Sequence, residues 1–232
     1  RRQRQMCIRD RINIIYEDNH LLVVEKPVNI PVQEDSSKDL DMITILKNYR
    51  KIKENKPNEA YIGLVHRLDR PVGGIMVFAK TSKAASRLSN QIRENTFHKT
   101  YIAVITGTLP NQGKLEDYLI KNNKTNISNV TTKEKGKYSA LEYKVLKAKD
   151  NLSLIEINLI TGRPHQIRVQ FSSRNHPLLG DSKYGKNPNN INIALFAKSI
   201  SFIHPTTKEK LTFSLDIPNS CLLYTSPSPR DP

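Results

Sequence analysis

Short apolar runs separated by polar turns follow one another along the chain, and this pattern predicts more strands than helices. The runs Tyr61–Val65 and Ile75–Ala79 are almost continuously apolar, which is typical of strands buried on both faces. Helical spacing of apolar residues predicts one helix from about Asp39 to Ile52. A second helix is predicted to begin at a capping residue, Thr81 or Ser82.

Polar turns between apolar runs also predict β-hairpins, the clearest at Lys149-Asp150-Asn151 between strands over 138–148 and 152–160. Other predicted elements are a hairpin with strands over 12–16 and 20–25, a strand over 100–106, a short helix over 165–173 and a last hairpin with strands over 195–203 and 211–215. The polar stretch from Lys121 to Lys137 is predicted as a loop. Many hairpins and few helices imply an α+β fold, with one domain on a mixed, largely antiparallel β-sheet flanked by a few helices.

The two ends of the chain differ from the rest. The N-terminal segment contains MCIRD, which can be written ATG TGT ATA AGA GAC, and the C-terminal segment contains CLLYT, which can be written TGT CTC TTA TAC ACA. The reverse complement of the first codon string overlaps the second base for base, and a folded protein has no reason for such complementarity. We interpret residues 1–11 and 220–232 as translated sequencing adapter, in preference to a basic arm and a Pro/Ser tail. The folded domain is then expected over residues 12–219.

Composition narrows the chemistry that the chain can support. Both cysteines, Cys7 and Cys221, lie in the end segments, so no disulfide, thiol nucleophile or cysteine-ligated zinc is expected. The formal net charge is +15, and the chain stays strongly basic without its ends. That charge suits a polyanionic partner but does not separate RNA, DNA and a membrane surface. No apolar run is long enough to span a bilayer and no signal-peptide pattern is present, so we expect a cytoplasmic protein.

The segment HRLDRPVGG, residues 66–74, carries the strongest candidate chemistry. It places Asp69 between Arg67 and Arg70 at a glycine-bounded turn between two apolar runs. Neighbouring guanidinium groups lower the pKa of a carboxyl group, so this aspartate is expected to be ionised at neutral pH. An ionised, positioned aspartate can serve as a nucleophile or a base. By charge pattern alone, a surface Arg–Asp pair explains the segment equally well.

The stretch HRLDRPVGGIMVFAKTSKAA resembles the catalytic motif of pseudouridine synthases of the RluA family. That motif reads His-Arg-Leu-Asp, two variable residues, Thr-Ser-Gly and an apolar strand ending in Ala-Lys. Four further segments resemble family motifs in the expected order: YEDNHLLVVEKPVNIPV (16–32), HKTYIAVITG (98–107), TGRPHQIRVQF (161–171) and HPLLGDSKYG (176–185). Together the matches run from about Tyr16 to Phe213. The chain departs from the pattern where Val72-Gly73 replaces Thr-Ser and where Val28-Asn29 replaces a small residue and glycine.

The resemblance implies an isomerase that converts uridine in RNA to pseudouridine without a metal or another cofactor. In this reaction the N-glycosidic bond breaks, the base rotates, and the base is rejoined through C5. Asp69 is implied as the catalytic carboxylate, which either attacks C1′ or removes a proton from C2′; the sequence does not decide between these routes. Tyr101 is implied to lie against the target base and to be a candidate for the C5 proton transfer. Arg163 resembles the family arginine that pairs with the aspartate.

The same resemblance places basic and polar residues around the bound RNA. Arg67 is expected to hold the flipped nucleotide or to fill its place, because the target uridine must leave its stack. His66 is expected to brace the turn. Further substrate-binding residues are expected to be Arg70, Lys80, Lys99, His165, Gln166 and Arg168. Two basic groups could follow phosphates or could be solvated charged faces: Lys80, Lys83, Arg87 and Arg93 in one, and Lys121, Lys124, Lys133, Lys135 and Lys137 in the other.

Ribosomal or transfer RNA is the expected partner of a monomer that needs no protein partner and no membrane. The main alternative is a non-catalytic RNA-binding or assembly protein that keeps the fold. A weaker alternative is a basic hydrolase that uses Asp69 with His165 or His176. Asp69, Tyr101 and Arg163 together favour catalysis, because a protein that only binds RNA does not need a positioned, ionised carboxylate.

Overall fold

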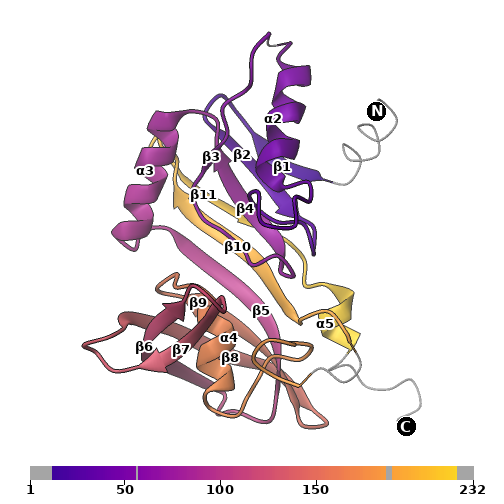
Figure 1. Ribbon diagram of the computed structural model, residues 1–232, viewed down its shortest axis with the longest axis vertical. Helices are drawn as coiled ribbons and strands as arrows, with labels where there is room; N and C mark the ends of the chain where they lie inside the picture. The colour runs from indigo at the N-terminus through magenta and orange to yellow at the C-terminus, as the bar shows by residue number, and fades with distance from the viewer. Residues whose placement is uncertain (1–11, 56, 187–189, 224–232) are drawn as a thin grey trace. The chain divides into compact units, whose positions relative to one another are not determined.

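The computed structural model describes residues 12–55, 57–186 and 190–223 (Figure 1). The chain divides into two compact units, drawn from Arg1–Phe97 with Ser199–Leu215 and from His98–Lys198 with Asp216–Pro232. Within the described ranges, no helix is both long enough and apolar enough to cross a membrane.

The first unit is built on antiparallel strand pairs. Its strands are β1 (Asn13–Glu17), β2 (Leu21–Lys26), β3 (Gly63–Leu64), β4 (Gly73–Ala79), the last part of β10 (Leu195–Ile203) and β11 (Lys210–Ser214). β2 pairs with β1 on one side and with β4 on the other, β3 also pairs with β4, and β11 pairs with β10. Every residue of β4 is buried, which explains its continuously apolar sequence.

Two helices complete the first unit, and each begins at a side-chain cap. α2 (Met42–Lys53) follows Asp41, whose carboxylate accepts the Thr44 N–H at 3.0 Å. α3 (Ser82–Arg93) follows Thr81, whose hydroxyl accepts the Ala84 N–H at 3.2 Å. The Gln91 side chain fixes α3 to the end of β10, because its amide donates to the Ile203 carbonyl at 2.7 Å and accepts the Ile203 N–H at 2.8 Å.

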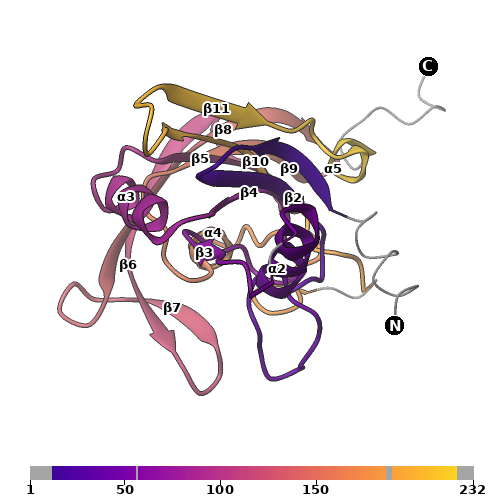
Figure 2. The ribbon, with the colours of Figure 1, turned by 90° about the horizontal axis from the view of Figure 1, so that it is seen from above.

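The second unit contains an antiparallel sheet in the order β5-β9-β8-β6-β7. The bounds are β5 (His98–Thr106), β6 (Gln112–Asn122), β7 (Ile127–Thr131), β8 (Lys137–Lys149) and β9 (Leu152–Leu159). This sheet curves around α4 (Gln166–Ser172), where Phe171 packs edge-on against Tyr143 of β8 with ring centroids 5.7 Å apart (Figure 2). The opposite face of β5 packs Ile102 and Val104 with Cys221 of α5 (Asn219–Leu223).

The predicted fold class is confirmed, and most predicted elements lie within a few residues of their observed bounds. The loop prediction for 121–137 is wrong, because much of this stretch forms the end of β6 and all of β7. Most residues of these two strands are exposed or half-buried and only a few are buried, among them Leu115 and Leu119, so the apolar signal is weak. The strand predicted over 61–65 shortens to β3. Of the two segments interpreted as adapter, residues 1–11 and 224–232 lie outside the described ranges, whereas residues 220–223 belong to α5 and Cys221 is buried. The adapter interpretation stays a prediction.

Candidate active site

The turn that carries Asp69 lies directly before β4 in the first unit. Leu68 and Val72 are buried on either side of it, whereas Asp69 is half-buried and Arg67 is exposed. The Val72 N–H donates to the Asp69 carbonyl at 3.0 Å and closes the turn. Two buried apolar side chains therefore anchor a short loop that leaves the carboxylate accessible.

Lys26, at the end of β2, supports this turn from inside the protein. Its side chain is buried, and its Nζ donates to the carbonyls of Pro27 at 2.9 Å, Arg70 at 3.1 Å and Val72 at 2.8 Å. Burial lowers the pKa of Lys26 to about 8, and the negative charge of Asp69 opposes that shift. The ammonium therefore fixes the backbone that follows Asp69, at Arg70 and Val72, and lies within electrostatic reach of the Asp69 carboxylate.

A second set of contacts holds the turn from the solvent side. The Asn29 N–H donates to the Arg70 carbonyl at 2.9 Å, and Arg70 Nε returns a bond to the Asn29 carbonyl at 3.2 Å. The Arg70 guanidinium also donates to Ser37 at 2.9 Å and to Asp39, and it pairs with Asp35 at 3.6 Å. The charge of Arg70 is therefore balanced by carboxylates within the protein. The contacts of its side chain hold the Asp69 turn against the segment that carries Asn29, Ser37 and Asp39.

The two departures from the family pattern meet at this turn. A Cβ atom on Gly73 would lie 3.1 Å from Cγ1 of Val28 and 3.3 Å from the Lys26 carbonyl. Val28 therefore fills the space that a side chain at position 73 would need. Asn29 has a φ of 64°, a left-handed conformation that asparagine tolerates better than most residues.

His66 contributes to the same turn as a brace. It is buried, and its Nε2 accepts the Val77 N–H of β4 at 3.2 Å. Its ring lies 5.5 Å from that of Phe97, centroid to centroid. An Nε2 that accepts a backbone N–H holds no proton, so this geometry supports the predicted bracing role.

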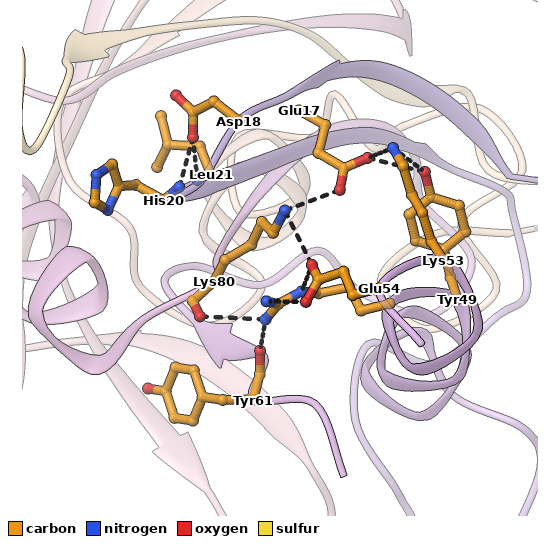
Figure 3. A network of polar contacts seen from close by, with 10 residues as sticks. Glu17, Asp18, His20, Leu21, Tyr49, Lys53, Glu54, Tyr61 and Lys80 are labelled. Carbon is orange, nitrogen blue, oxygen red and sulfur yellow. Dashed lines mark hydrogen bonds and ion pairs between the residues drawn. The ribbon is translucent and has the colours of Figure 1, made fainter. Parts of the chain in front are cut away.

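Lys80 is placed differently from the sequence-based expectation. Its side chain is 8% exposed, and its Nζ pairs with Glu17 at 2.9 Å and with Glu54 at 3.2 Å (Figure 3). Arg50 completes the network through its ion pair with Glu54 at 2.8 Å. Burial alone would raise the pKa of Glu17, but the bonds from Lys53 and Lys80 outweigh it and lower this pKa. A buried ammonium with two carboxylate partners is a structural group, so we do not assign Lys80 to RNA.

In the second unit, Tyr101 lies on β5 directly opposite Ile157 of β9 and is 7% exposed. Arg163 lies in the loop between β9 and α4. Its backbone N–H donates to the side-chain oxygen of Gln166 at 3.0 Å, and its Nε donates to the Tyr138 carbonyl at 3.0 Å. The side chain of Arg163 is thus oriented by the sheet next to it.

Gln166 determines the shape of this loop. Besides the Arg163 N–H, its side-chain oxygen accepts the Thr161 hydroxyl at 2.7 Å, and its side-chain nitrogen donates to the Ala140 carbonyl at 3.0 Å. Gln166 is buried, and all three contacts are intramolecular, the one to Ala140 fully buried and the other two partly buried. The structure therefore places it as a support for Arg163, where the sequence predicted a contact with RNA.

Arg168 and His165 also have partners inside the second unit. Arg168 makes two bonds to the buried carboxylate of Asp181, at 2.8 and 2.7 Å. Burial would raise the pKa of Asp181, and the bonds from Arg168 lower it. His165 has a φ of 54° and its Nδ1 lies 2.6 Å from the Tyr184 hydroxyl. Arg168 is therefore a core ion-pair residue, which a local pattern does not predict because its partner, Asp181, lies in a different segment.

The comparisons with known proteins bear on this arrangement. Residues 20–173 match the family described as RNA pseudouridylate synthase. The chain belongs to that family.

Several curated relatives of this chain come from bacteria. The chain is 37% identical over 210 residues to the ribosomal large subunit pseudouridine synthase C of Buchnera aphidicola subsp. Schizaphis graminum, a match that covers 86% of the chain and 65% of the relative. It is 32% identical over 222 residues to the uncharacterized RNA pseudouridine synthase YhcT of Bacillus subtilis, covering 93% and 73%. The chain thus spans less than two thirds of the length of the Buchnera relative.

A solved structure shows the fold of the family member. Human RNA pseudouridylate synthase domain containing 4 superposes with a TM-score of 0.78, at 22% identity, over 95% of this chain and 94% of that one. Within the family member, the first unit carries Asp69 with its supports, and the second carries Tyr101, Arg163 and Lys99. Sequence reasoning assigns no role to Lys26, which supports the Asp69 turn, because the burial of its side chain is not visible in the sequence.

Proposed function

We propose that this protein is an RNA pseudouridine synthase that uses Asp69 as its catalytic carboxylate. The observation that carries the proposal is the Asp69 turn itself, since a buried ammonium fixes the backbone that directly follows a half-buried carboxylate. Family membership supports the same reading. A positioned carboxylate is costly to hold in this way, and binding of RNA alone would not require it.

The reaction needs three groups, and the chain offers a residue for each. Asp69 acts at the ribose, by attack at C1′ or by removal of the C2′ proton. Tyr101 provides a flat aromatic face for the base and a hydroxyl for transfer of the C5 proton. Arg163 provides a guanidinium that can pair with the carboxylate and orient it. Arg67, which is exposed next to Asp69, is proposed to hold the flipped nucleotide.

We further propose ribosomal RNA as the first substrate to test and transfer RNA as the second. The Buchnera relative is named as a ribosomal large subunit enzyme, which supports this order. The exposed lysines on the β6–β7 and β7–β8 connections and at the start of β8 offer contacts for phosphates: Lys124, Lys133, Lys135 and Lys137. An enzyme that modifies ribosomal RNA works where ribosomes are assembled, so the proposed location is the cytoplasm. The proposed enzyme acts as a monomer and requires no cofactor.

The test compares the wild-type protein with Asp69→Asn on unmodified ribosomal and transfer RNA. Pseudouridine is mapped by carbodiimide labelling and reverse-transcription stops. Asp150→Asn serves as the control, because it makes the same chemical change at an exposed hairpin turn whose φ of 50° suits asparagine. We expect new stops with wild type and with Asp150→Asn, and none with Asp69→Asn.

The same experiment discriminates the alternative of a non-catalytic RNA-binding protein. If wild type and Asp69→Asn bind RNA equally and neither forms pseudouridine, the catalytic proposal fails and the binding function replaces it. If Asp69→Asn forms pseudouridine as fast as wild type, another group is the catalytic carboxylate.

A further inference from the structure

Lys99 shares a strand face with Tyr101 in the second unit. The two residues are two positions apart on β5, so their side chains lie on the same side of the sheet. Tyr101 stands opposite Ile157, and Ile157 stands opposite Tyr143, whose ring packs against Phe171 of α4. Lys99 therefore occupies the end of the face that carries Tyr101 and α4.

The ammonium of Lys99 reaches the loop that carries Arg163. A Cβ atom on Gly162 would lie 3.1 Å from Nζ of Lys99, and it would meet no other atom within 4 Å. Gly162 is exposed, and Lys99 is half-buried. The absence of a side chain at position 162 thus leaves room for a group from solvent to reach the ammonium between β5 and the loop.

The charge of Lys99 is not neutralised within the described part of the second unit. The hydrogen bonds and ion pairs found there include none for Lys99, whereas the neighbouring basic residue Lys198 pairs with Glu156 at 2.7 Å. Burial lowers the pKa of Lys99, and no nearby charge contributes to the shift. A half-buried cation without an anionic partner is a site that favours binding of an anion.

We propose that Lys99 binds an RNA phosphodiester group next to the base held by Tyr101, with Gly162 providing the space. This inference rests on the proposed function, because it takes the bound polyanion to be the substrate RNA. The shared face of β5 explains the location, since it presents the Lys99 ammonium on the same side of the strand as the Tyr101 ring. Arg163 and Lys99 then act on different parts of the nucleotide.

The test measures binding of fluorescein-labelled oligouridylate by fluorescence anisotropy at several salt concentrations. We expect Lys99→Met to bind about tenfold more weakly at low salt. We also expect the slope of log affinity against log salt to fall by about 0.7, the value for one phosphate contact to a single strand. Lys99→Arg keeps the charge and is expected to keep the slope.

Lys198→Met is the matched control. It removes one lysine from the same unit, but the partner of Lys198, Glu156, stands opposite Ile102, whose side chain lies on the other face of β5 from Tyr101. We expect this variant to bind like wild type. Melting curves of all variants show whether each one is folded under the conditions of the binding assay.

The outcomes separate this inference from the proposed function. Equal affinity and equal slope for Lys99→Met and wild type would overturn the inference, and if wild type also forms pseudouridine the proposed function stands alone. If Lys99→Met loses the phosphate contact but wild type forms no pseudouridine, the phosphate site stands and the catalytic proposal falls. If wild type does not bind oligouridylate at all, the phosphate site is overturned.

Discussion

Replacement of Lys26 by methionine tests whether the buried ammonium positions Asp69. Methionine keeps the apolar stem and removes the charge and the donor. Three carbonyls then lose a hydrogen bond, those of Pro27, Arg70 and Val72. Because the Asn29 N–H also bonds the Arg70 carbonyl, the loss concerns mainly the other two. An unsatisfied carbonyl costs about 1–3 kcal/mol, so the loss amounts to about 2–6 kcal/mol.

An opposite effect reduces this loss. The wild-type protein holds a charged lysine in a buried site, where its pKa is about 8. The difference from the ordinary lysine value, about 10.4, corresponds to a cost of about 3 kcal/mol that methionine avoids. The two effects nearly offset each other, so we expect a net loss of at most about 3 kcal/mol in the free energy of unfolding. We expect a larger effect on the rate, because a turn that has lost its fixed points no longer holds Asp69 in place.

The assay combines urea unfolding with single-turnover formation of pseudouridine at saturating enzyme. Lys80→Met is the control, because it also removes a buried ammonium from the first unit but leaves the contacts of the Asp69 turn unchanged. We expect both variants to unfold at lower urea and only Lys26→Met to lose rate, by about 100-fold for a displaced catalytic group. The reasoning is refuted if Lys26→Met keeps the wild-type rate, or if Lys80→Met loses as much.

The remaining predictions concern pH, packing and a buried ion pair. The folded-state pKa of Lys26, about 8, lies below the ordinary lysine value, so the unfolded chain binds more protons than the folded chain at pH values between the two. The contribution of Lys26 to stability therefore rises with pH in that window. The single-turnover rate is expected to fall above pH about 8, because the Lys26 ammonium loses its proton. Gly73→Ala is expected to lower the free energy of unfolding by about 1 kcal/mol through contact with Val28, and urea unfolding of the double variant with Val28→Ala is expected to show partial recovery; additive effects would contradict the contact. Arg168→Met leaves the carboxylate of Asp181 buried without its cation, so thermal unfolding at pH 7 is expected to show a loss of about 3–5 kcal/mol that shrinks in acid, and a loss independent of pH would contradict this reason.

The parts of the fold that the sequence predicts are those whose residues satisfy a local rule. β4 was predicted because all of its residues are buried and apolar, and α3 because Thr81 caps a helix with Ala84 and Leu88 on its inner face. The sequence does not predict the β6–β7 hairpin, because few of its residues are buried and most are polar, so their strand conformation depends on pairing with β8.

The candidate site divides in a similar way. Asp69, Tyr101 and Arg163 could be found because they stand in motifs, although their roles stay proposals. Basic residues could not be sorted, because a sequence shows a positive charge but not its partner. Lys80 finds Glu17 63 positions away along the chain, and Lys26 finds the Val72 carbonyl 46 positions away. Such long-range pairs depend on how strands assemble, which no local pattern contains.

The contact between Val28 and Gly73 has a consequence for how this sequence arose. A serine at position 73, as in the family pattern, would bring its Cβ to 3.1 Å from Cγ1 of Val28 and to 3.3 Å from the Lys26 carbonyl. If glycine replaced serine at position 73 first, valine could then be accepted at position 28 without strain. If valine came first, the intermediate sequence would hold both Val28 and a serine at position 73, and their side chains would be crowded. The two replacements therefore have a preferred historical order. Restoring the serine by itself today would reproduce the crowded intermediate rather than the ancestral protein.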